Sequence, residues 1–400
     1  MRLPVSLIAV LTCATLAGCE FEEGPVAAAD SGGGFSEPPP AAPYVYAPPA
    51  DISDGWSTGD RGGADFDVAR IETMMTGIAN GEHPGIVSVA IARNGKLLLH
   101  WYDEGRYLDD YDAQVGNTRR DVHALHSVTK SVTSALVGIA MDQGYLSSTD
   151  TGFYSLFSYS HYAHWDDRKY RMTLDDALTM RLGFTWDEWS TPYSSTNNSL
   201  AKLSASYDDW AKALLDLPMA RSPGTDFEYN TAASTAIGQA VENVTGMPLE
   251  LFADAYLFDP MSIATDRWTY SPTGLAVGGS GLFLSTRDLV KFGQLWLDGG
   301  TWQGRRLVSA DYVAASVTPW VDVSAEVSRN TGYGYQWWLG QFSYNGTAVD
   351  YWLANGYGGQ FLIVVPSLDL VVAFAGRNFE NAAGAARVYM LVESYVLAAM

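Results

Sequence analysis

Two segments of the chain place a lysine three positions after a serine, a spacing at which an amine can activate a hydroxyl. The segments are Ser127-Val128-Thr129-Lys130 and Ser199-Leu200-Ala201-Lys202. Side chains three positions apart lie on one face of a helix, so the amine can reach the hydroxyl. Burial lowers the pKa of a lysine toward neutrality, and the amine can then act as a base at pH 7. A serine-rich chain with six lysines is expected to contain one such match by chance, so the surroundings of each serine must decide.

The residues that follow Ser127 predict a buried helix. No charged residue lies between Lys130 and Asp142, and apolar residues recur there at helical spacing. Ser127 would stand at the N-terminus of this helix, where the dipole and the free amides favour developing negative charge. Ser199 instead follows the polar stretch 194–198, which is typical of a solvated surface. We therefore predict that Ser127 is the nucleophile and Lys130 its base. The alternative is an ordinary N-cap serine that a lysine happens to follow.

The positions of the six histidines argue against other hydrolytic chemistries. None lies beyond His164, which nearly excludes the order serine, acid, histidine of α/β-hydrolases. The chain also contains neither Gly-x-Ser-x-Gly nor His-Glu-x-x-His. The pairs His123/His126 and His161/His164 have one-turn spacing, but no third ligand accompanies them at a fixed spacing. We predict neither a metal nor a cofactor.

The composition bounds the class of protein. The 400 residues carry 45 Asp and Glu against 24 Lys and Arg, for a net charge of -21. Phosphate backbones repel so acidic a chain, and nucleic acid is therefore not an expected partner. Apolar residues make up 47% of the chain, which excludes a wholly disordered protein. Cys13 and Cys19 are the two cysteines, so no disulfide framework is expected beyond residue 19.

The N-terminus has the pattern of an export signal. Met1-Arg2 precedes an apolar run, residues 3–14, which is too short to span a bilayer. Leu16-Ala17-Gly18-Cys19 then resembles the bacterial lipobox, which implies a lipoprotein signal peptide over residues 1–19 and a lipid on Cys19. The alternative is an ordinary cleaved signal peptide with a chance cysteine. The expected location is the periplasmic side of the cell envelope, anchored through this lipid. The outer membrane is favoured because the residue after Cys19 is Glu20 and not the aspartate that some bacteria use for inner-membrane retention.

A change of composition separates this leader from the rest of the chain. Residues 20–65 hold seven of the seventeen prolines and nine acids against one base, which predicts a disordered tether. From residue 66 the chain reads as one folded domain that ends at residue 400. Asn94-Gly95 joins two strand-like runs into a hairpin. The predicted elements are a helix over 66–78, strands over 86–92, 96–102, 361–365 and 370–375, a final helix over 382–400, and a mostly helical stretch over about 144–285.

Strands at both ends of this domain with helices between them predict an α/β (α+β) fold. We expect one antiparallel sheet built from the two chain ends, flanked by helices, with the helical stretch inserted as a subdomain.

Five segments in order give the chain a resemblance to a known family. Ser127-x-x-Lys130 resembles the first motif of the serine β-lactamase and penicillin-binding-protein superfamily, class C branch. The later similar segments are Leu174–Trp186 ("LLTM-SG-W"), Pro223–Asn230 (P-G-x-x-F-x-Y-S-N), Gly278–Leu289 (GG-G-L then RD-L-F) and Gly356–Gln360 (Lys/His-x-Gly). The resemblance implies a β-lactamase/transpeptidase-like fold. Within the superfamily the chain looks most similar to esterases, 6-aminohexanoate-dimer-hydrolase-like amidases and D-amino-acid peptidases.

The resemblance also implies roles for individual residues. Ser127 would attack the substrate carbonyl, and Lys130 would hold or take its proton. Tyr229 would be the second base or proton shuttle, its phenolate favoured by the nearby ammonium. The backbone N–H groups of Ser127 and Gln360 would form the oxyanion hole. Gly358 and Gly359 would let that strand approach the substrate closely, although a simple turn also explains them.

The chain departs from the family pattern at two motifs. The second motif reads Tyr229-Asn230-Thr231 rather than Tyr-x-Asn, so either Asn230 or Thr231 takes the polar role. The third motif has Tyr357 where β-lactamases and transpeptidases place the lysine that attracts a substrate carboxylate. This change favours neutral ester or amide substrates. Five tryptophans are candidates for an apolar acyl pocket, with core packing as the alternative: Trp186, Trp189, Trp337, Trp338 and Trp352.

The leading hypothesis is therefore a serine hydrolase that cleaves esters or small amides through an acyl-enzyme on Ser127. A β-lactamase or D-amino-acid peptidase that acts on cell-wall material is the first alternative. The second is a catalytically inactive envelope binding protein that keeps the fold.

Overall fold

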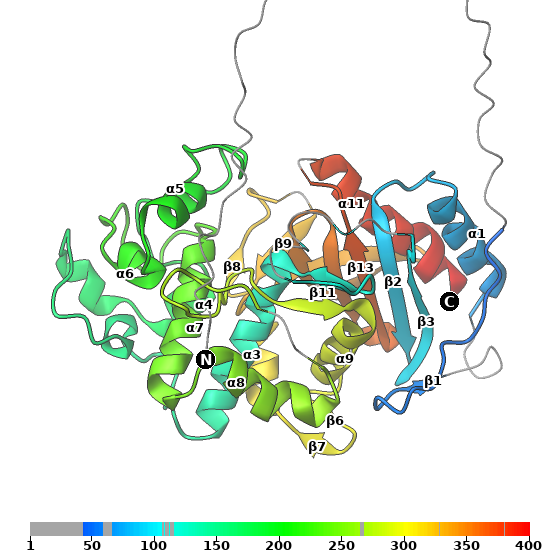
Figure 1. Ribbon diagram of the computed structural model, residues 1–400, viewed down its shortest axis with the longest axis horizontal. Coiled ribbons are helices and arrows are strands. Elements are labelled where there is room, and N and C mark those ends of the chain that lie inside the picture. The colour runs from blue at the N-terminus through cyan, green and yellow to red at the C-terminus, as the bar shows by residue number, and fades with distance from the viewer. Residues whose placement is uncertain are drawn as a thin grey trace, which may run out of the picture.

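One large sheet contains the N-terminal hairpin and the strands of the C-terminal part of the chain (Figure 1). The computed structural model describes residues 43–58, 66–105, 108, 112, 116–264, 268–327, 329–379 and 381–400. The nine strands run in the order β1-β3-β2-β13-β12-β11-β10-β9-β8. Neighbours are antiparallel except β1, which pairs parallel with β3. The strands are β1 Ser57–Thr58, β2 Ile86–Arg93, β3 Lys96–Tyr102, β8 Val321–Asp322, β9 Asn330–Tyr333, β10 Trp338–Tyr344, β11 Thr347–Gly356, β12 Gln360–Val365 and β13 Leu370–Gly376.

The predicted pairing of the two chain ends is confirmed. β2 pairs with β13 from Ile86↔Gly376 to Arg93↔Leu370, which joins the N-terminal and C-terminal hairpins into one sheet. Asn94 and Gly95 have φ of 50° and 69°, the left-handed geometry that a tight hairpin turn requires. The sequence pattern did not predict strands β8 to β11.

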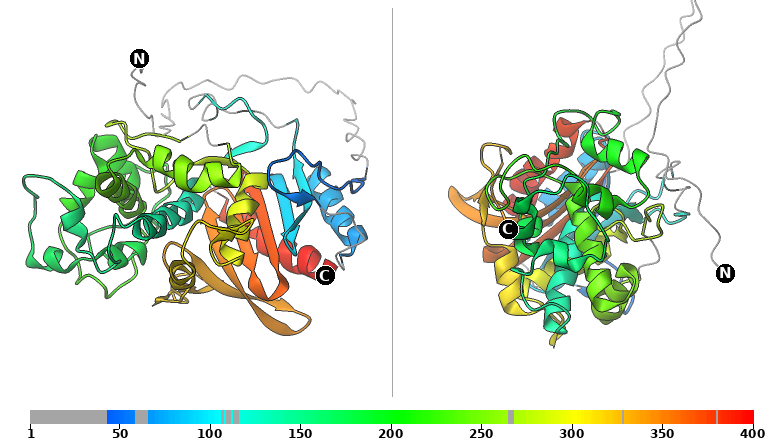
Figure 2. Two further views of the ribbon diagram at one scale, coloured as in Figure 1. Left: turned by 90° about the horizontal axis from the view of Figure 1, so that it is seen from below. Right: turned by 90° about the vertical axis from the view of Figure 1, so that its left-hand side faces the viewer.

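Helices cover both faces of the sheet. Side chains alternate along β12, so that Ile363 belongs to the same core cluster as α1 (Val68–Ala79) and α11 (Ala382–Leu391), while Leu362 and Val364 belong to the cluster that contains α9 (Thr286–Leu297). The first and last helical segments of the described residues therefore share one face (Figure 2). The predicted helices over 66–78 and 382–400 are confirmed as α1 and as α11, which continues through further helical turns to Ala399.

A helical subdomain lies beside the sheet, on the left in Figure 1. Its centre is the packing of α3 against α7, and α3 is buried at every residue from Thr129 to Ala140. The short strands β4 (Val122–Ala124) and β5 (Phe283–Ser285) pair with each other, and each leads directly into a helical segment. The helices are α3 Thr129–Asp142, α4 Leu174–Leu178, α5 Ser199–Ser206, α6 Trp210–Leu215, α7 Thr231–Thr245 and α8 Leu249–Ala253. Further elements of the described chain are α10 Ala310–Ser316 and the hairpin of β6 Thr301–Trp302 with β7 Arg305–Arg306. None of the helices within the described ranges is long and apolar enough to cross a membrane.

Residues 43–58 differ from the predicted tether, because they pack against the domain. Tyr46 and Trp56 are 5% and 4% exposed, and the Tyr46 hydroxyl donates to the Leu98 carbonyl at 2.8 Å. Asp54 forms an ion pair with Arg287 at 2.7 Å and lies 3.2 Å from the buried amine of Lys291. The proline and glycine content predicted disorder, but the aromatic side chains Tyr46 and Trp56 bury enough surface to hold this segment on the domain.

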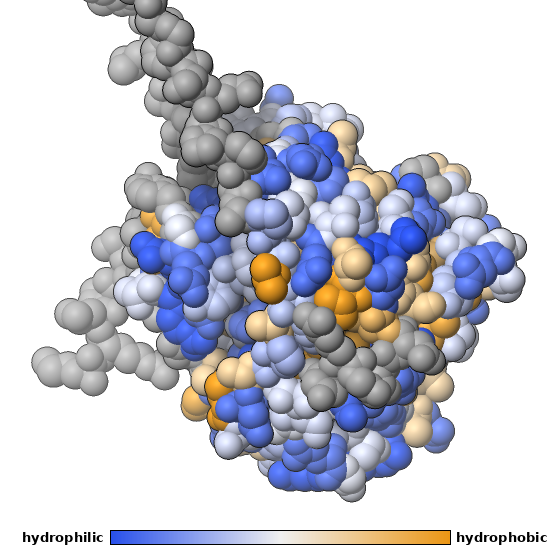
Figure 3. Space-filling model, turned by 90° about the vertical axis from the view of Figure 1, so that its right-hand side faces the viewer, coloured by the Kyte–Doolittle hydropathy of each residue, from blue (hydrophilic) through white to orange (hydrophobic). Residues whose placement is uncertain are grey.

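The surface on this side of the molecule is mainly hydrophilic, with apolar residues in small groups (Figure 3). Val45 and Ile52 are among the exposed apolar residues of segment 43–58. The predicted signal peptide, Cys19 and residues 20–42 lie outside the described residues.

Candidate active site

Ser127 lies in a tight turn between β4 and α3. A 3₁₀ turn spans His126–Val128, and α3 begins at Thr129, so Ser127 precedes the first helical residue by two positions. His126 has φ of 47°, a left-handed conformation that is uncommon for a residue with a side chain. This bend places the half-buried Ser127 hydroxyl at the end of the buried helix, as the sequence predicted.

Lys130 is the buried partner of Ser127. Its side chain is 1% exposed, and Nζ lies 2.9 Å from Ser127 Oγ, 2.9 Å from Thr231 Oγ1 and 2.9 Å from the Gly279 carbonyl oxygen. Burial lowers the pKa of Lys130 to about 7, while the charge of Glu188 acts in the opposite direction. A lysine with this pKa is present partly as a neutral amine at pH 7, and it can accept a proton from Ser127.

Tyr229 covers the other side of Lys130. The Lys130 amine is 4.9 Å from the centre of the Tyr229 ring, and that ring stacks against Trp189 at 5.1 Å and Trp338 at 5.7 Å. We expected the ammonium to favour the phenolate. Instead, burial raises the pKa of Tyr229 and the charge of Glu188 raises it further, while a hydrogen bond with Ser127 acts in the opposite direction. Tyr229 is therefore a phenol at neutral pH, which suits a proton donor and not a base.

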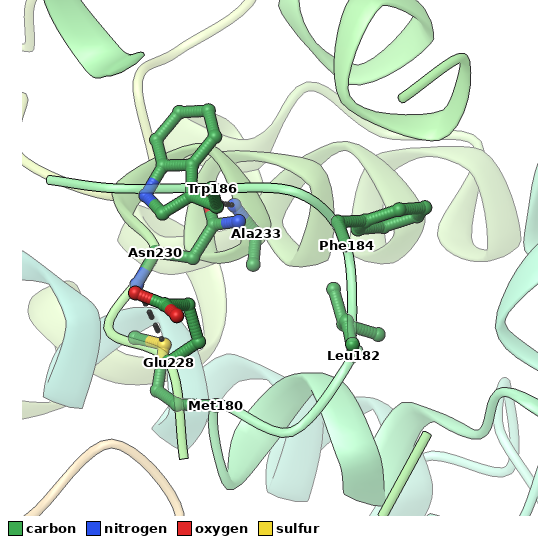
Figure 4. Close-up of a pocket in the computed structure, with 8 residues that line it drawn as sticks. Met180, Leu182, Phe184, Trp186, Glu228, Asn230 and Ala233 are labelled. Carbon is green, nitrogen blue, oxygen red and sulfur yellow. Dashed lines mark hydrogen bonds between the residues drawn. The ribbon is translucent and has the colours of Figure 1, made fainter. Parts of the chain in front are cut away.

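The two candidate polar residues of the second motif have different positions. Asn230 is the N-cap of α7, and its Oδ1 accepts from the Ala233 amide at 2.9 Å. It lies in a small pocket with Met180 and Trp186 (Figure 4). Thr231, the next residue, is the one whose hydroxyl contacts the Lys130 amine. The polar position beside the base is thus occupied by Thr231.

Glu188 is a buried carboxyl group that the sequence analysis did not identify. It is 2% exposed and accepts four hydrogen bonds, from the Thr231 amide at 2.8 Å, the Thr231 hydroxyl at 2.5 Å, the Trp186 indole at 3.2 Å and the Tyr193 hydroxyl at 3.0 Å. Asn198 fixes the backbone here, because its amide donates to the Glu188 carbonyl at 2.9 Å. The signal available in the sequence was an acid between two tryptophans, Trp186 and Trp189, just after a segment similar to a family motif.

The third motif forms the turn between β11 and β12, next to the Ser127 turn. Gly358 and Gly359 have φ of 84° and 98°, and a Cβ on Gly358 would come within 2.4 Å of the Phe379 ring. Both conditions require glycine. A Cβ on Gly356 would lie 2.3 Å from the Leu125 carbonyl oxygen, so the end of β11 lies directly against the segment that carries Ser127.

Gln360 and Tyr357 flank this glycine pair. The Gln360 side chain is hydrogen-bonded to the backbone of Gly376, with Nε2 donating at 2.6 Å and Oε1 accepting at 3.3 Å. It therefore ties β12 to β13, which leaves the backbone amide as the group through which Gln360 could act on a substrate. The Tyr357 ring contacts the rings of Tyr193 at 5.2 Å and His126 at 5.8 Å.

The five tryptophans have three different settings. Trp189 and Trp338 stack on each other and on Tyr229 at the site, and Trp189 is 46% exposed. Trp186 binds Glu188. Trp337 is fully buried against Phe292 and Trp296, and Trp352 packs against the same large core, so these two are core residues.

The second serine-lysine pair lies on the surface. Ser199 is the first residue of α5, and its hydroxyl accepts from the Asp187 amide at 3.0 Å. Lys202 is exposed. As for metals, the described part of the chain has no group of three His, Cys, Asp or Glu placed to hold an ion.

Known proteins share this arrangement of elements. The family model described as "Beta-lactamase" matches residues 69–394. The chain belongs to the Beta-lactamase family. The family places it in the serine hydrolase superfamily that also contains the penicillin-binding proteins, and the fold agrees with the one that the sequence predicted.

Relatives of the family match most of the chain. The 6-aminohexanoate-dimer hydrolase of Paenarthrobacter ureafaciens is 24% identical over 298 residues, which are 70% of each protein. A penicillin-binding-protein homologue from Caulobacter crescentus has a TM-score of 0.63 at 16% identity, covering 83% of this chain and 97% of that one. EstCE1, described as a hydrolase with promiscuous acyltransferase activity, has a TM-score of 0.62 at 16% identity, covering 82% and 98%.

Proposed function

We propose that this protein cleaves neutral esters or small amides through an acyl-enzyme on Ser127. The observation that carries the proposal is the contact between Ser127 Oγ and a buried lysine whose pKa is about 7. A serine hydroxyl becomes a nucleophile when a neighbouring base takes its proton, and Lys130 has both the position and the pKa for that role. Membership of the Beta-lactamase family supports the same chemistry.

The first half of the reaction forms the acyl-enzyme. Ser127 Oγ bonds to the carbonyl carbon while its proton passes to Lys130 Nζ, and the electron pair of the carbonyl moves onto its oxygen. The amides of Ser127 and Gln360 would hydrogen-bond that oxyanion, which is worth roughly 3–4 kcal/mol per donor in comparable sites. When the tetrahedral intermediate collapses, the bond to the leaving group breaks and the leaving alcohol or amine takes a proton. Tyr229, a phenol in contact with Ser127, would donate that proton and would regain one from the Lys130 ammonium beside it, so that Lys130 is a neutral amine again.

The second half releases the acid. Water attacks the acyl carbonyl carbon, Lys130 accepts a proton from the water, and Ser127 Oγ leaves and is protonated again. Within each half, the proton that Lys130 takes is passed on again, so both residues regain their starting forms, and the cycle consumes only water and needs no cofactor.

Substrate preference follows from the groups around Ser127. Tyr357 cannot supply the positive charge that a substrate carboxylate would seek, because its phenol is neutral. The half-exposed Trp189 stacks on Tyr229, and Tyr193 contacts Tyr357, so aromatic side chains adjoin the residues of the site. These features support a neutral, partly apolar acyl group, and the relatives named for 6-aminohexanoate-dimer hydrolysis and for acyl transfer fit that class. We place the chain in the class C branch on the motifs at residues 174–186 and 223–230.

Activity-based labelling tests the proposal. A fluorophosphonate probe should label the wild-type protein and not Ser127→Ala, while Ser199→Ala should be labelled like the wild type. Hydrolysis of p-nitrophenyl esters should then exceed hydrolysis of nitrocefin and of D-alanyl amides. A preference for nitrocefin or D-alanyl amides would favour the β-lactamase or D-amino-acid peptidase alternative. Neither labelling nor hydrolysis would favour an inactive envelope binding protein.

We also propose that Cys19 carries a lipid that anchors the protein on the periplasmic side of the envelope. The support is the lipobox-like sequence Leu16–Cys19 after an apolar run. Metabolic labelling with an alkyne-bearing palmitate should mark the wild-type protein and leave Cys19→Ala unmarked. Equal labelling of both would contradict the anchor.

A further inference from the structure

We propose that Glu188 is a positioning residue for the lysine base, and that it aims the electron pair of Lys130 at Ser127 through the Thr231 hydroxyl. The inference rests on the proposed function, since it concerns how Lys130 takes the Ser127 proton. It assigns a purpose to a buried acid that no family motif required, and it makes the catalytic unit a chain of four groups: Ser127, Lys130, Thr231 and Glu188.

The hydrogen bonds at Glu188 show that it is a carboxylate. Oε2 accepts from two groups that can only donate, the Thr231 amide at 2.8 Å and the Trp186 indole at 3.2 Å. Oε1 lies 2.5 Å from the Thr231 hydroxyl and 3.0 Å from the Tyr193 hydroxyl, and both of these hold a proton that they can donate. Four donors converge on one buried carboxyl group, and a charged acceptor is the form that satisfies them all.

The charge at Glu188 determines the direction of the next hydrogen bond. A threonine hydroxyl has one proton, and in Thr231 that proton points to Oε1. Toward Lys130, at 2.9 Å, Thr231 Oγ1 can therefore only accept. The same holds for the Gly279 carbonyl oxygen, also 2.9 Å away, which has no proton to donate.

These two acceptors orient the neutral form of Lys130. A neutral amine has two N–H bonds and one electron pair, and the two N–H bonds are taken by Thr231 and Gly279. The third contact of Nζ is Ser127 Oγ at 2.9 Å, so the electron pair faces the Ser127 hydroxyl. This is the geometry in which a base accepts the nucleophile's proton, and it matches the general arrangement of a base that is oriented by a third group.

The same carboxylate also stabilises the product of proton transfer. When Lys130 becomes an ammonium, Glu188 is the buried negative charge beside it, and this charge raises the pKa of Lys130 against the effect of burial. Among the described residues, the titratable groups that face Lys130 are Tyr229, at 4.9 Å from its ring, and Glu188 through Thr231; Tyr193 faces Glu188 in turn.

The test compares kcat/KM for a p-nitrophenyl ester across pH in Glu188→Gln, Glu188→Asp, Thr231→Val and Thr231→Ser. In Glu188→Gln the amide can donate to Thr231, which would turn the Thr231 proton toward Lys130 and occupy its electron pair. We expect kcat/KM to fall roughly a hundredfold, the lower end for loss of a positioned base. The acid limb of the profile should move to lower pH by about one unit or more, because an opposite charge is lost. Glu188→Asp should restore the position of the limb.

The threonine pair tests the geometry without changing the charge. Thr231→Val should lower kcat/KM roughly tenfold or more with a smaller shift of the limb, whereas Thr231→Ser, which keeps the hydroxyl, should recover most of that loss. Asp176→Asn is the matched control, because Asp176 is also a buried acid but caps α4, so its loss should reduce stability and leave the limb unchanged.

Each result decides between positioning and a purely structural role. Unchanged kcat/KM in Glu188→Gln, or a loss with an unmoved acid limb, would overturn the inference. If Glu188→Gln does not fold, equal activities of Thr231→Val and Thr231→Ser would overturn it instead. Failure of the proposed function is separate, because it would appear as a wild-type protein without ester hydrolysis or as hydrolysis that survives Ser127→Ala.

Discussion

The chain contains the same four-residue pattern in two places, and only one of them has the surroundings of a catalytic pair. At Ser127 the lysine is 1% exposed and its amine touches the serine hydroxyl. At Ser199 the lysine is exposed, and the serine hydroxyl accepts a backbone amide at the start of a surface helix. The spacing is identical, so spacing alone does not produce a base.

Burial changes the chemistry of the first pair. Desolvation disfavours the charged form of Lys130 and lowers its pKa to about 7, which makes a neutral amine available. The backbone also differs, because Ser127 lies in a 3₁₀ turn before its helix, while Ser199 is the first residue of α5. The comparison shows that the helical spacing brings the lysine amine to the serine hydroxyl, whereas burial in the core lowers the pKa of that amine and makes it a base.

Removing each serine should give the largest contrast. Ser127→Ala should lower kcat for ester hydrolysis by roughly 10⁴-fold or more, since the nucleophile is lost. Ser199→Ala should leave kcat within about twofold. Initial rates with a p-nitrophenyl ester measure both. A comparable loss in Ser199→Ala would show that the surface pair takes part in the reaction.

Removing each lysine should give the next largest contrast. Lys130→Met should lower kcat/KM by roughly 10³-fold, within the range for loss of a general base. Lys202→Met is the matched variant on the surface and should behave as the wild type. Thermal unfolding should be followed in parallel. Near-normal hydrolysis by a folded Lys130→Met protein would refute the assignment of the base.

The pH dependence should report the ionisation of Lys130. The active form is the neutral amine, so kcat/KM should be constant above the pKa and should fall as the pH drops through about 7. Below that value the loss should approach about tenfold per pH unit, because each unit reduces the neutral fraction tenfold. Lys202→Met should show the same profile as the wild type. A rate that is flat from pH 5 to 9 would be inconsistent with a lysine base.

The smallest effect is expected for the aromatic neighbour. Tyr229→Phe keeps the ring above Lys130 and removes only the hydroxyl, so kcat should fall roughly tenfold to a hundredfold through loss of a proton donor. The effect should be larger for amides than for esters with a good leaving group. Tyr207→Phe, at the exposed end of α5 beside the surface pair, is the control and should have no effect. If Tyr229→Phe hydrolyses amides as fast as the wild type does, Tyr229 has no part in the mechanism.

Much of the fold could be predicted because local signals were strong. Asn94-Gly95 marked the first hairpin, and a charge-free apolar stretch marked α3. Asn345 and Gly346, with φ of 50° and 76°, form the same kind of turn between β10 and β11, so that hairpin carried a signal that the sequence analysis did not use.

The site was predictable only in part. Lys130 is three positions after Ser127, and Tyr229 follows a Pro-Gly segment, so each stands in a local pattern. Glu188 stands in no such pattern. Its neighbour Asp187 is also an acid but is exposed to solvent, and the sequence does not indicate which of the two is buried. Of the partners of Glu188, Trp186 and Tyr193 are close to it in the sequence, whereas Thr231 is 43 residues away, and only the folded structure brings Thr231 to it.

The docked segment 43–58 has a consequence for how far the domain could stand from a membrane. If Cys19 holds a lipid, as we propose, the segment that links the lipid to the domain ends at residue 42 and not at residue 65. The reason is that Trp56 and Asp54 pack on the domain. Residues 20–42 number 23, and no conformation of 23 residues spans more than roughly 80 Å. The tether predicted from composition would have reached about twice as far. The shorter link would keep the active site closer to the bilayer surface, and it would meet only substrates within that distance.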